Sequence, residues 1–214
     1  METDEIKHSG VTDEIKQGLI QKNRYINVDH DWWADVYEWF IEYLEKVGIE
    51  TTRSRQGFDI CFSGFHSQGD GACFGGRIDD WDLFFSAHPQ VFRGDTFAYA
   101  TSYKSDIIDA AYWGHNGSRY FHPHTLGFCI EVNSGYECEI DEEGHPVDLA
   151  DAVKLSLQNV FDYVGFEDAI QDIVRGYCAD LYTRLSKEYD YLTSDEVVWE
   201  SVIASELYIE DNDE

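Results

Sequence analysis

The feature that most constrains the fold is a long stripe of apolar residues near the C-terminal end of the chain. Its members recur every three or four residues: Phe166, Ile170, Ile173, Val174, Tyr177, Leu181 and Leu185. This spacing aligns them on one side of an α-helix, so the sequence predicts a helix over residues 166–190. A shorter stripe predicts another helix over residues 149–161.

A third apolar stripe lies in the N-terminal part of the chain. Its members are Trp32, Trp33, Val36, Tyr37, Phe40, Ile41, Leu44 and Val47. We expect Asp29 or Asp31 to cap this helix and Gly48 to end it. The preceding 28 residues mix charges with weak periodicity, which indicates a loosely ordered arm or a short helix around residues 12–22.

Between these stripes the pattern is that of β-strands. Residues 58–62 and 72–78 predict one hairpin with an irregular, glycine-rich connection. Residues 105–113 and 119–132 flank an Asn-Gly pair at residues 116–117, a strong turn signal, and predict a second hairpin. A short helical turn is expected over residues 79–88, ended by a proline.

Near the C-terminus, Thr193 followed by Glu196 predicts a capping box that opens a last helix through Ala204. The predicted fold class is therefore α+β: an antiparallel sheet of two hairpins packed against amphipathic helices. We expect residues 1–28 to form a loosely ordered N-terminal arm. Residues 29–214 are predicted to form a single α+β domain with an acidic C-terminal helical part.

The charge of the chain excludes several classes of function. Against 15 Lys and Arg stand 43 Asp and Glu, a net charge of −28, while 43% of residues are hydrophobic. Such a chain can fold, but it lacks the clustered bases that a phosphate backbone requires, and anionic membranes would repel it. With no run of 18 apolar residues and no signal-peptide pattern, we expect a cytoplasmic protein.

Most of the negative charge lies near the C-terminus. Residues 137–214 hold 22 acids and 4 bases, a net charge of −18. Duplex DNA carries roughly 18 charges over about 30 Å, so imitation of a polyanion by this part is plausible in magnitude. Two base-free segments, 137–151 and 188–214, supply the residues expected to contact a partner. These are Glu139, Asp141, Glu142, Glu143, Asp195, Glu196 and Glu200.

The glycine-rich segment 63–74 is the other candidate site. A catalytic interpretation uses Asp70 or His66 as a base and Ser63 or Ser67 as a nucleophile, with Gln68 beside them. The structural interpretation is that Asp70 and Ser67 cap backbone amides while glycines permit the turn. We favour the structural interpretation, because this turn chemistry is common and the segment lacks the ending of a phosphate-binding loop.

Histidines and cysteines are the other candidate metal ligands and nucleophiles. His122 and His124 would project from one face of a strand, with His115 nearby, but no second ligand pair accompanies them. We therefore expect no metal and no cofactor. Cys61 and Cys73 lie in predicted strands and are interpreted as inert, buried thiols. The five cysteines are an odd number without a CxxC pair, which favours reduced thiols.

Two stretches resemble a known family: SGFHSQGDGACF at residues 63–74 and EYDYLTSDE at residues 188–196. Together with the Trp-Trp helix near residue 32 and the acidic close at 206–210, they are similar to small acidic, mostly uncharacterised phage and prophage proteins. Some members carry an antitoxin-like label. Residues 79–104 and the N-terminal arm depart from the pattern. The resemblance implies a phage setting, hence a host cytoplasm, and no catalytic residue.

Three functions follow as hypotheses. The leading one is a non-enzymatic phage accessory protein whose DNA-mimic-like acidic surface blocks a basic, nucleic-acid-binding host protein of a defence system, such as a restriction or CRISPR component. The second is an antitoxin-type protein that neutralises a specific toxin through acids and the apolar surface of its C-terminal helices. The third is a hydrolase or transferase with its site in loop 63–74.

Overall fold

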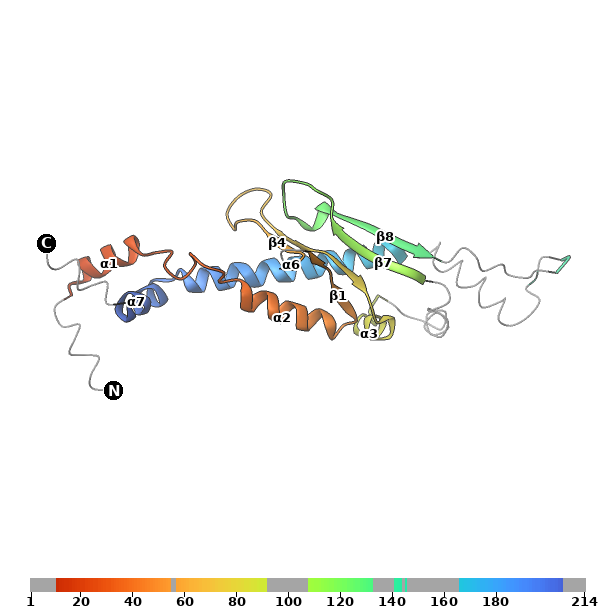
Figure 1. The fold of residues 1–214 in the computed structure, drawn as a ribbon, viewed down its shortest axis with the longest axis horizontal. Helices are drawn as coiled ribbons and strands as arrows, with labels where there is room; N and C mark the ends of the chain where they lie inside the picture. The colour runs from red at the N-terminus through yellow and green to blue at the C-terminus, as the bar shows by residue number, and fades with distance from the viewer. Residues whose placement is uncertain are drawn as a thin grey trace. The chain divides into compact units, whose positions relative to one another are not determined.

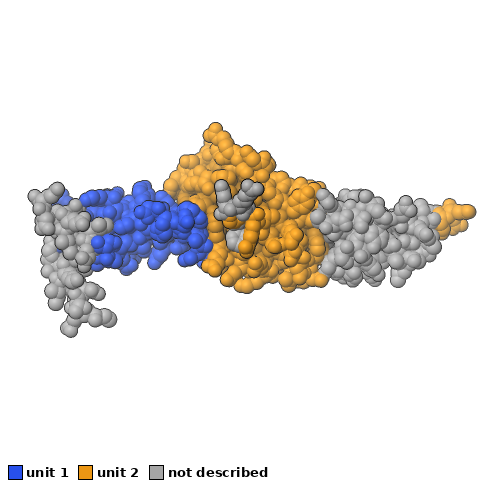
Figure 2. All heavy atoms as spheres, viewed as in Figure 1, with its two compact units in different colours: residues 1–36, 183–214 blue, residues 37–182 orange. Residues whose placement is uncertain are grey.

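The structure, a computed structural model, describes residues 11–54, 57–91, 108–132, 141–143, 145 and 166–205 (Figure 1). It confirms the predicted α+β fold class, with helices and antiparallel sheets. The chain divides into two compact units (Figure 2). Unit 1 comprises Met1–Val36 and Thr183–Glu214, and unit 2 comprises Tyr37–Tyr182. The predicted helix over residues 149–161 lies outside the described residues.

Unit 2 is built on a four-stranded antiparallel sheet with the strand order β1-β6-β7-β8. Its strands are β1 (Ile49–Thr51), β6 (Gly76–Ile78), β7 (Ile108–His115) and β8 (Leu126–Val132). Two smaller antiparallel pairs join β2 (Arg53–Ser54) to β3 (Gly57–Phe58), and β4 (Ile60–Phe62) to β5 (Ala72–Phe74). Both predicted hairpins are therefore present, as β4-β5 and β7-β8.

The core of unit 2 is rich in aromatic side chains. Phe40 of α2 (Ala34–Glu45) meets Phe74 edge to face, with ring centroids 5.2 Å apart, and Phe74 meets Trp113 of β7 at 5.6 Å. The long helix α6 (Phe166–Leu192) confirms the C-terminal stripe, since Ile170, Val174, Tyr177, Leu181 and Leu185 are all buried. Apolar periodicity alone was sufficient to locate this element.

A buried polar chain joins α3 (Trp81–Ala87) to α6 within unit 2. His88, which follows α3, is 6% exposed. Its Nδ1 lies 2.6 Å from the Phe84 carbonyl oxygen, and its Nε2 lies 2.7 Å from the Tyr177 hydroxyl. Because the carbonyl only accepts, Nδ1 carries the proton and Nε2 accepts from Tyr177. Burial lowers the pKa of His88, so the imidazole is held neutral.

Unit 1 has a small core of its own. α1 (Asp13–Lys22) packs against α7 (Asp195–Ala204) through Leu19, Ile20, Val198 and Val202. Asn27, in the connection between α1 and α2, forms hydrogen bonds with the last residue of α6 and with α7. Its Nδ2 donates to the Leu192 carbonyl, and its Oδ1 accepts from the Ser201 hydroxyl at 2.7 Å. The short helix expected around residues 12–22 is confirmed as α1.

Two predicted helix starts are too early: by one residue for α7, and by two or four residues for α2 with Asp31 or Asp29 as the expected cap. The N-terminal helix begins at Ala34, because turn hydrogen bonds, including Ala34 N–H to the Asp31 carbonyl, hold Trp32 and Trp33 before the first helical residue. α7 is capped by Ser194, whose side chain accepts from Val197 N–H. The expected cap, Thr193, instead donates its hydroxyl to the Tyr189 carbonyl at 2.8 Å.

Glycines explain where two elements end. Gly48 follows α2 with φ of 79°, and a Cβ there would lie 2.1 Å from the Asp80 carbonyl oxygen. The predicted strand 72–78 is divided at Gly75, where a Cβ would lie 2.4 Å from both Asp59 and Thr52 side-chain oxygens. This division lets β5 pair with β4 while β6 pairs with β1 and β7.

Candidate functional site

The acidic face of α7 is the first candidate. Glu196 and Glu200 are one helical turn apart, so they share one side of the helix, and both are exposed. On the opposite side, Val198 and Val202 are fully buried in the core of unit 1. Neither glutamate has a hydrogen bond or ion pair with any part of the chain that the structure describes. The two carboxylates are thus available for contact with another molecule.

Asp195 differs from these neighbours because it is ion-paired within unit 1. Arg24 donates through Nη1 to an Asp195 carboxylate oxygen and, at 2.9 Å, to the Thr193 carbonyl. The Arg24 side chain is 22% exposed and the Asp195 side chain 55%. Asp195 therefore holds the start of α7 beside the connection that follows α1. It remains a predicted partner contact, but part of its charge is already compensated.

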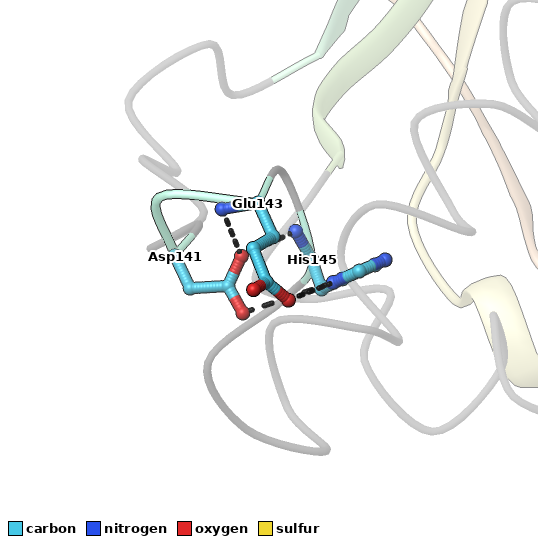
Figure 3. A group of neighbouring side chains, drawn as sticks. All are labelled: Asp141, Glu143 and His145. Atoms are coloured by element: carbon cyan, nitrogen blue, oxygen red, sulfur yellow. Dashed lines mark hydrogen bonds and ion pairs between the residues drawn. The ribbon is translucent and has the colours of Figure 1, made fainter.

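The second acidic segment lies in unit 2, at residues 141–145 (Figure 3). Asp141 Oδ1 accepts from Glu143 N–H at 2.9 Å and from His145 N–H at 2.8 Å. The imidazole of His145 faces the carboxylates of Asp141 and Glu143, with Nδ1 to oxygen distances of 3.8 and 3.9 Å. Asp141 therefore shapes a turn that leaves Glu142 and Glu143 exposed.

The side chains of Asp141, Glu143 and His145 could also hold a cation. One ligand atom from each lies within 4.8 Å of the other two, and all three residues are exposed. Carboxylate oxygens and an imidazole nitrogen are ordinary metal ligands. The same arrangement is equally that of a histidine paired with its acidic neighbours in a solvated turn.

One of the seven predicted partner contacts, Glu139, lies outside the described residues.

The glycine-rich loop 63–71 uses its polar groups internally. Asp70 Oδ2 accepts from the backbone N–H groups of His66 and Ser67, at 2.9 and 2.6 Å. Ser63 Oγ accepts from Gly71 N–H at 3.3 Å. These contacts confirm the capping role predicted for Asp70. Ser67 takes part through its backbone, because its carbonyl accepts from Asp70 N–H.

A catalytic arrangement is not formed in this loop. Among the described residues, no hydrogen bond joins the His66 ring to Ser63, Ser67 or Asp70, and His66 is exposed. Gln68 is exposed as well. The carboxylate that would act as a base is already engaged by two amides. The structure thus gathers the four residues of the predicted loop site into one turn without arranging them as a nucleophile and its base.

The loop is fixed on both sides within unit 2. A Cβ at Gly71 would lie 2.8 Å from the Phe121 carbonyl oxygen, so the connection between β7 and β8 approaches the loop closely. Phe65 stacks on Tyr182 of α6, with centroids 5.6 Å apart, and the Tyr182 hydroxyl donates to the Gly64 carbonyl. The glycines therefore serve close backbone packing.

The histidines do not project from one strand face as the pattern suggested. Pro123–Thr125 forms a short 3-10 helix, so β8 begins only at Leu126. His122 caps this turn through Nδ1, which accepts from His124 N–H, and the two imidazole rings stack at 5.1 Å. His115 Nε2 donates to the Tyr120 carbonyl at 3.0 Å. All three side chains organise the β7-β8 connection.

The cysteines lie as predicted in strands. Cys61 of β4 is half-buried and Cys73 of β5 is buried. Burial raises the pKa of both thiols, that of Cys73 to about 12, so both are protonated at neutral pH. Protonated thiols are weak nucleophiles, and the inertness expected of Cys61 and Cys73 stays a prediction.

Sequence reasoning missed the basic partners of the acids. Arg24 and His145 each contact carboxylates that were assigned to a partner, and neither residue was singled out. The available signal was the composition: with 43 Asp and Glu against 15 Lys and Arg, each base has several carboxylates with which it can pair. The choice itself depends on tertiary structure, since Arg24 and Asp195 are 171 residues apart.

Comparison with known proteins gives the family of the chain. Residues 32–195, more than half of the 214, match the family described as "Domain of unknown function (DUF8835)". The chain belongs to the DUF8835 family. No curated protein and no solved structure matches it. The DUF8835 match includes loop 63–71 and residues 141–145, and it ends at Asp195, just before the two exposed glutamates of α7.

The described helices differ in length and in apolar character. None of them combines the length and the apolar character needed to cross a bilayer. The longest, α6, has 27 residues and carries acids and bases along its length.

Proposed function

We propose that this DUF8835 protein is a non-enzymatic phage accessory protein that occupies the basic, nucleic-acid-binding surface of a host defence protein and blocks it. The observation that carries the proposal is the exposed acidic face of α7, Glu196 and Glu200, on a helix whose other side is fixed in a core. A rigid display of carboxylates can match the lysines and arginines that would otherwise contact phosphates.

The overall charge supports this class of partner. The net charge of −28 would attract a basic surface over a long range and so speed the encounter with it. The same charge would repel nucleic acid. Residues 141–143 offer a second exposed acidic segment in unit 2. Asp141, Glu143 and Asp195 also carry internal contacts, so we assign the main electrostatic role to Glu142, Glu196 and Glu200.

Loss of nucleic-acid binding by the partner is the direct test. Partners would be captured from host lysate at low salt, purified, and mixed with a fluorescent DNA or RNA duplex. We expect the wild-type protein to displace the duplex as measured by anisotropy. The variant E196Q/E200Q should need about fivefold more protein, because two exposed charge pairs contribute roughly 1 kcal/mol together.

The control variant is D13N/E14Q, which removes two exposed acids from α1 of the same unit. Its net charge equals that of E196Q/E200Q, so any difference between the two reflects position. Captured partners that keep their duplex in the presence of saturating wild-type protein would refute the proposal. Equal loss of displacement in both variants would show that total charge matters and the α7 face does not.

An antitoxin-type role is the second candidate, and one observation favours it. Tyr191, near the end of α6, is 60% exposed, and Tyr25 in the same unit is 62% exposed. Exposed aromatic side chains beside acids are typical of specific protein contacts. This role predicts a toxic neighbouring reading frame whose toxicity this protein alone relieves. Rescue by the wild-type protein but not by Y25A/Y191A would favour it over imitation of a polyanion.

A further inference from the structure

A pair of cysteines lies across the β4-β5 hairpin of unit 2. Cys61 and Cys73 are directly opposite each other in the antiparallel register, between the pairs Ile60–Phe74 and Phe62–Ala72. Side chains of directly opposed residues leave the sheet on the same face. The two thiols are therefore neighbours, and after burial the nearby Cys61 is the next cause of the raised pKa of Cys73.

The backbone hydrogen bonds define the spacing of this pair. Ser63 N–H donates to the Gly71 carbonyl at 3.0 Å, and Gly75 N–H donates to the Asp59 carbonyl at 2.8 Å. These bonds lie two residues to either side of Cys61 and Cys73. Because hydrogen-bonded and non-hydrogen-bonded pairs alternate, the cysteines form a hydrogen-bonded pair, for which the Cα separation is about 5.5 Å. Disulfides span about 4.4–6.8 Å between Cα atoms, which this separation meets, and about 3.5–4.5 Å between Cβ atoms. The Cβ atoms of a hydrogen-bonded pair are about 5.5 Å apart, so the two strands must draw together by roughly 1 Å at this pair for the bond to form.

The two thiols differ in access. Cys73 is 1% exposed, whereas Cys61 is half-buried and can meet a small reagent. Besides burial, the Asp59 carboxylate raises the pKa of both thiols, and a hydrogen bond with Thr125 lowers that of Cys73. The pair in turn raises the pKa of Tyr37, and Cys73 raises that of Cys178 on α6. No cationic group stabilises a thiolate of this pair among the contacts that the structure describes. The pair therefore stays reduced unless an oxidant is supplied.

We infer that Cys61 and Cys73 are an oxidisable pair that forms a disulfide across β4 and β5 when the protein meets hydrogen peroxide. In the first step the Cys61 thiolate attacks a peroxide oxygen, the O–O bond breaks, and Cys61 becomes a sulfenic acid as hydroxide leaves. The Cys73 sulfur then attacks the Cys61 sulfur, and the S–O bond breaks. Two thiols lose two electrons, and the peroxide is reduced to two waters.

The bond would close the glycine-rich loop covalently. Residues 63–71 connect the two strands and pack on Phe121, so a link between Cys61 and Cys73 tethers both ends of the loop at the sheet. Such a link restricts the unfolded chain and should raise the midpoint of thermal unfolding. A thiol reductant would reverse the change. This inference does not involve the acidic surface, so it stands independently of the proposed function.

The sequence around the pair makes the test direct. Trypsin cleaves after Arg55 and Arg77, and the resulting peptide 56–77 contains Cys61, Cys73 and no other cysteine. The folded protein would be treated with hydrogen peroxide, denatured in N-ethylmaleimide and digested. We expect peptide 56–77 to lose the mass of two hydrogens and take up no maleimide. Without peroxide it should carry two maleimides.

Other products would overturn the inference. A link between peptide 56–77 and peptide 176–184 would show that Cys73 pairs with Cys178 instead. A peptide that gains oxygen atoms, forms a bond between two chains, or still carries two maleimides after peroxide would equally contradict it. Because the wild-type protein is used, none of these outcomes depends on whether a variant folds.

Variants and pH give a second readout. C61S and C73S should abolish the loss of hydrogens, whereas C129S and C178S should oxidise as the wild type does. Because burial raises the pKa of Cys61, its thiolate fraction, and with it the rate, should rise about tenfold per pH unit between about pH 7 and pH 9. A rate independent of pH, or disulfide formation in C61S, would be incompatible with attack by Cys61.

Discussion

Two polar regions of this protein use their charged groups in opposite ways. In loop 63–71 of unit 2, the Asp70 carboxylate is taken up by two backbone amides. On α7 of unit 1, Glu196 and Glu200 are exposed and have no partner among the described residues. The first region looks more like a catalytic site in the sequence, but only the second leaves its acids available. The hydrogen bonds that a carboxylate accepts within the protein show whether it serves the fold or is available for binding. The number of acids in a segment does not show this.

Because loop 63–71 packs closely against its surroundings, we expect one added methyl group there to lower the stability of the protein. In G71A, the added Cβ would overlap the Phe121 carbonyl, which is backbone and cannot swing away. We expect a loss of about 2–3 kcal/mol in the free energy of unfolding, measured by urea denaturation. G114A is the matched control, because nothing lies within 4 Å of its Cβ. Equal stability of the two variants would show that the loop does not pack closely.

Removal of the loop carboxylate should have the next largest effect. D70A leaves the amides of His66 and Ser67 without their acceptor, so we expect about 1–2 kcal/mol of destabilisation. Amide hydrogen exchange at these two residues should accelerate, while exchange in β7 remains slow. D70N, which keeps a side-chain oxygen, should recover part of the loss. Unchanged exchange at both amides in D70A would mean that Asp70 does not cap the turn.

Acid should weaken unit 2 through His88. Its pKa is lowered in the folded state, so the unfolded chain binds a proton first as the pH falls below the ordinary histidine value of about 6.5. Stability is therefore full at neutral pH and declines below it, by at most about 1.4 kcal/mol per pH unit for one group. The variant H88N should show a weaker decline between about pH 7 and pH 5. A decline identical to that of the wild type would assign it to other groups.

The smallest effect is expected on the acidic face itself. E196Q/E200Q should change the free energy of unfolding by less than about 0.5 kcal/mol, because both side chains are exposed and neither contributes a contact within the described chain. Thermal and urea denaturation would check this. A loss above about 1 kcal/mol would show that these acids, like Asp70, are structural, and the contrast between the two regions would disappear.

The sequence was sufficient to predict those elements of the fold that a single local pattern determines. The spacing of apolar residues located α6, and the Asn-Gly turn located the β7-β8 hairpin. Prediction failed where neighbouring groups compete for the same role. Thr193 and Ser194 are both good caps, and the choice depends on which hydroxyl reaches the Tyr189 carbonyl. The division of the 72–78 strand depends on Asp59 and Thr52, whose approach to Gly75 is tertiary.

The candidate sites were predicted in part. The capping role of Asp70 follows from local turn chemistry, which the sequence contains in full. The pairing of Asp195 with Arg24 could not be derived, because it joins residues 171 positions apart. The sequence also places acids in two segments without indicating their units. Asp141, Glu142 and Glu143 belong to unit 2, whereas Asp195, Glu196 and Glu200 belong to unit 1.

The salt dependence of partner binding tests the central claim most directly. The dissociation constant of the complex with a captured partner would be measured by titration calorimetry from about 0.05 to 0.5 M salt for the wild type, E196Q/E200Q and D13N/E14Q. We predict that wild-type affinity falls at least about tenfold over this range and that E196Q/E200Q shows a shallower dependence than D13N/E14Q. Affinity that is flat with salt, or three identical curves, would contradict the account.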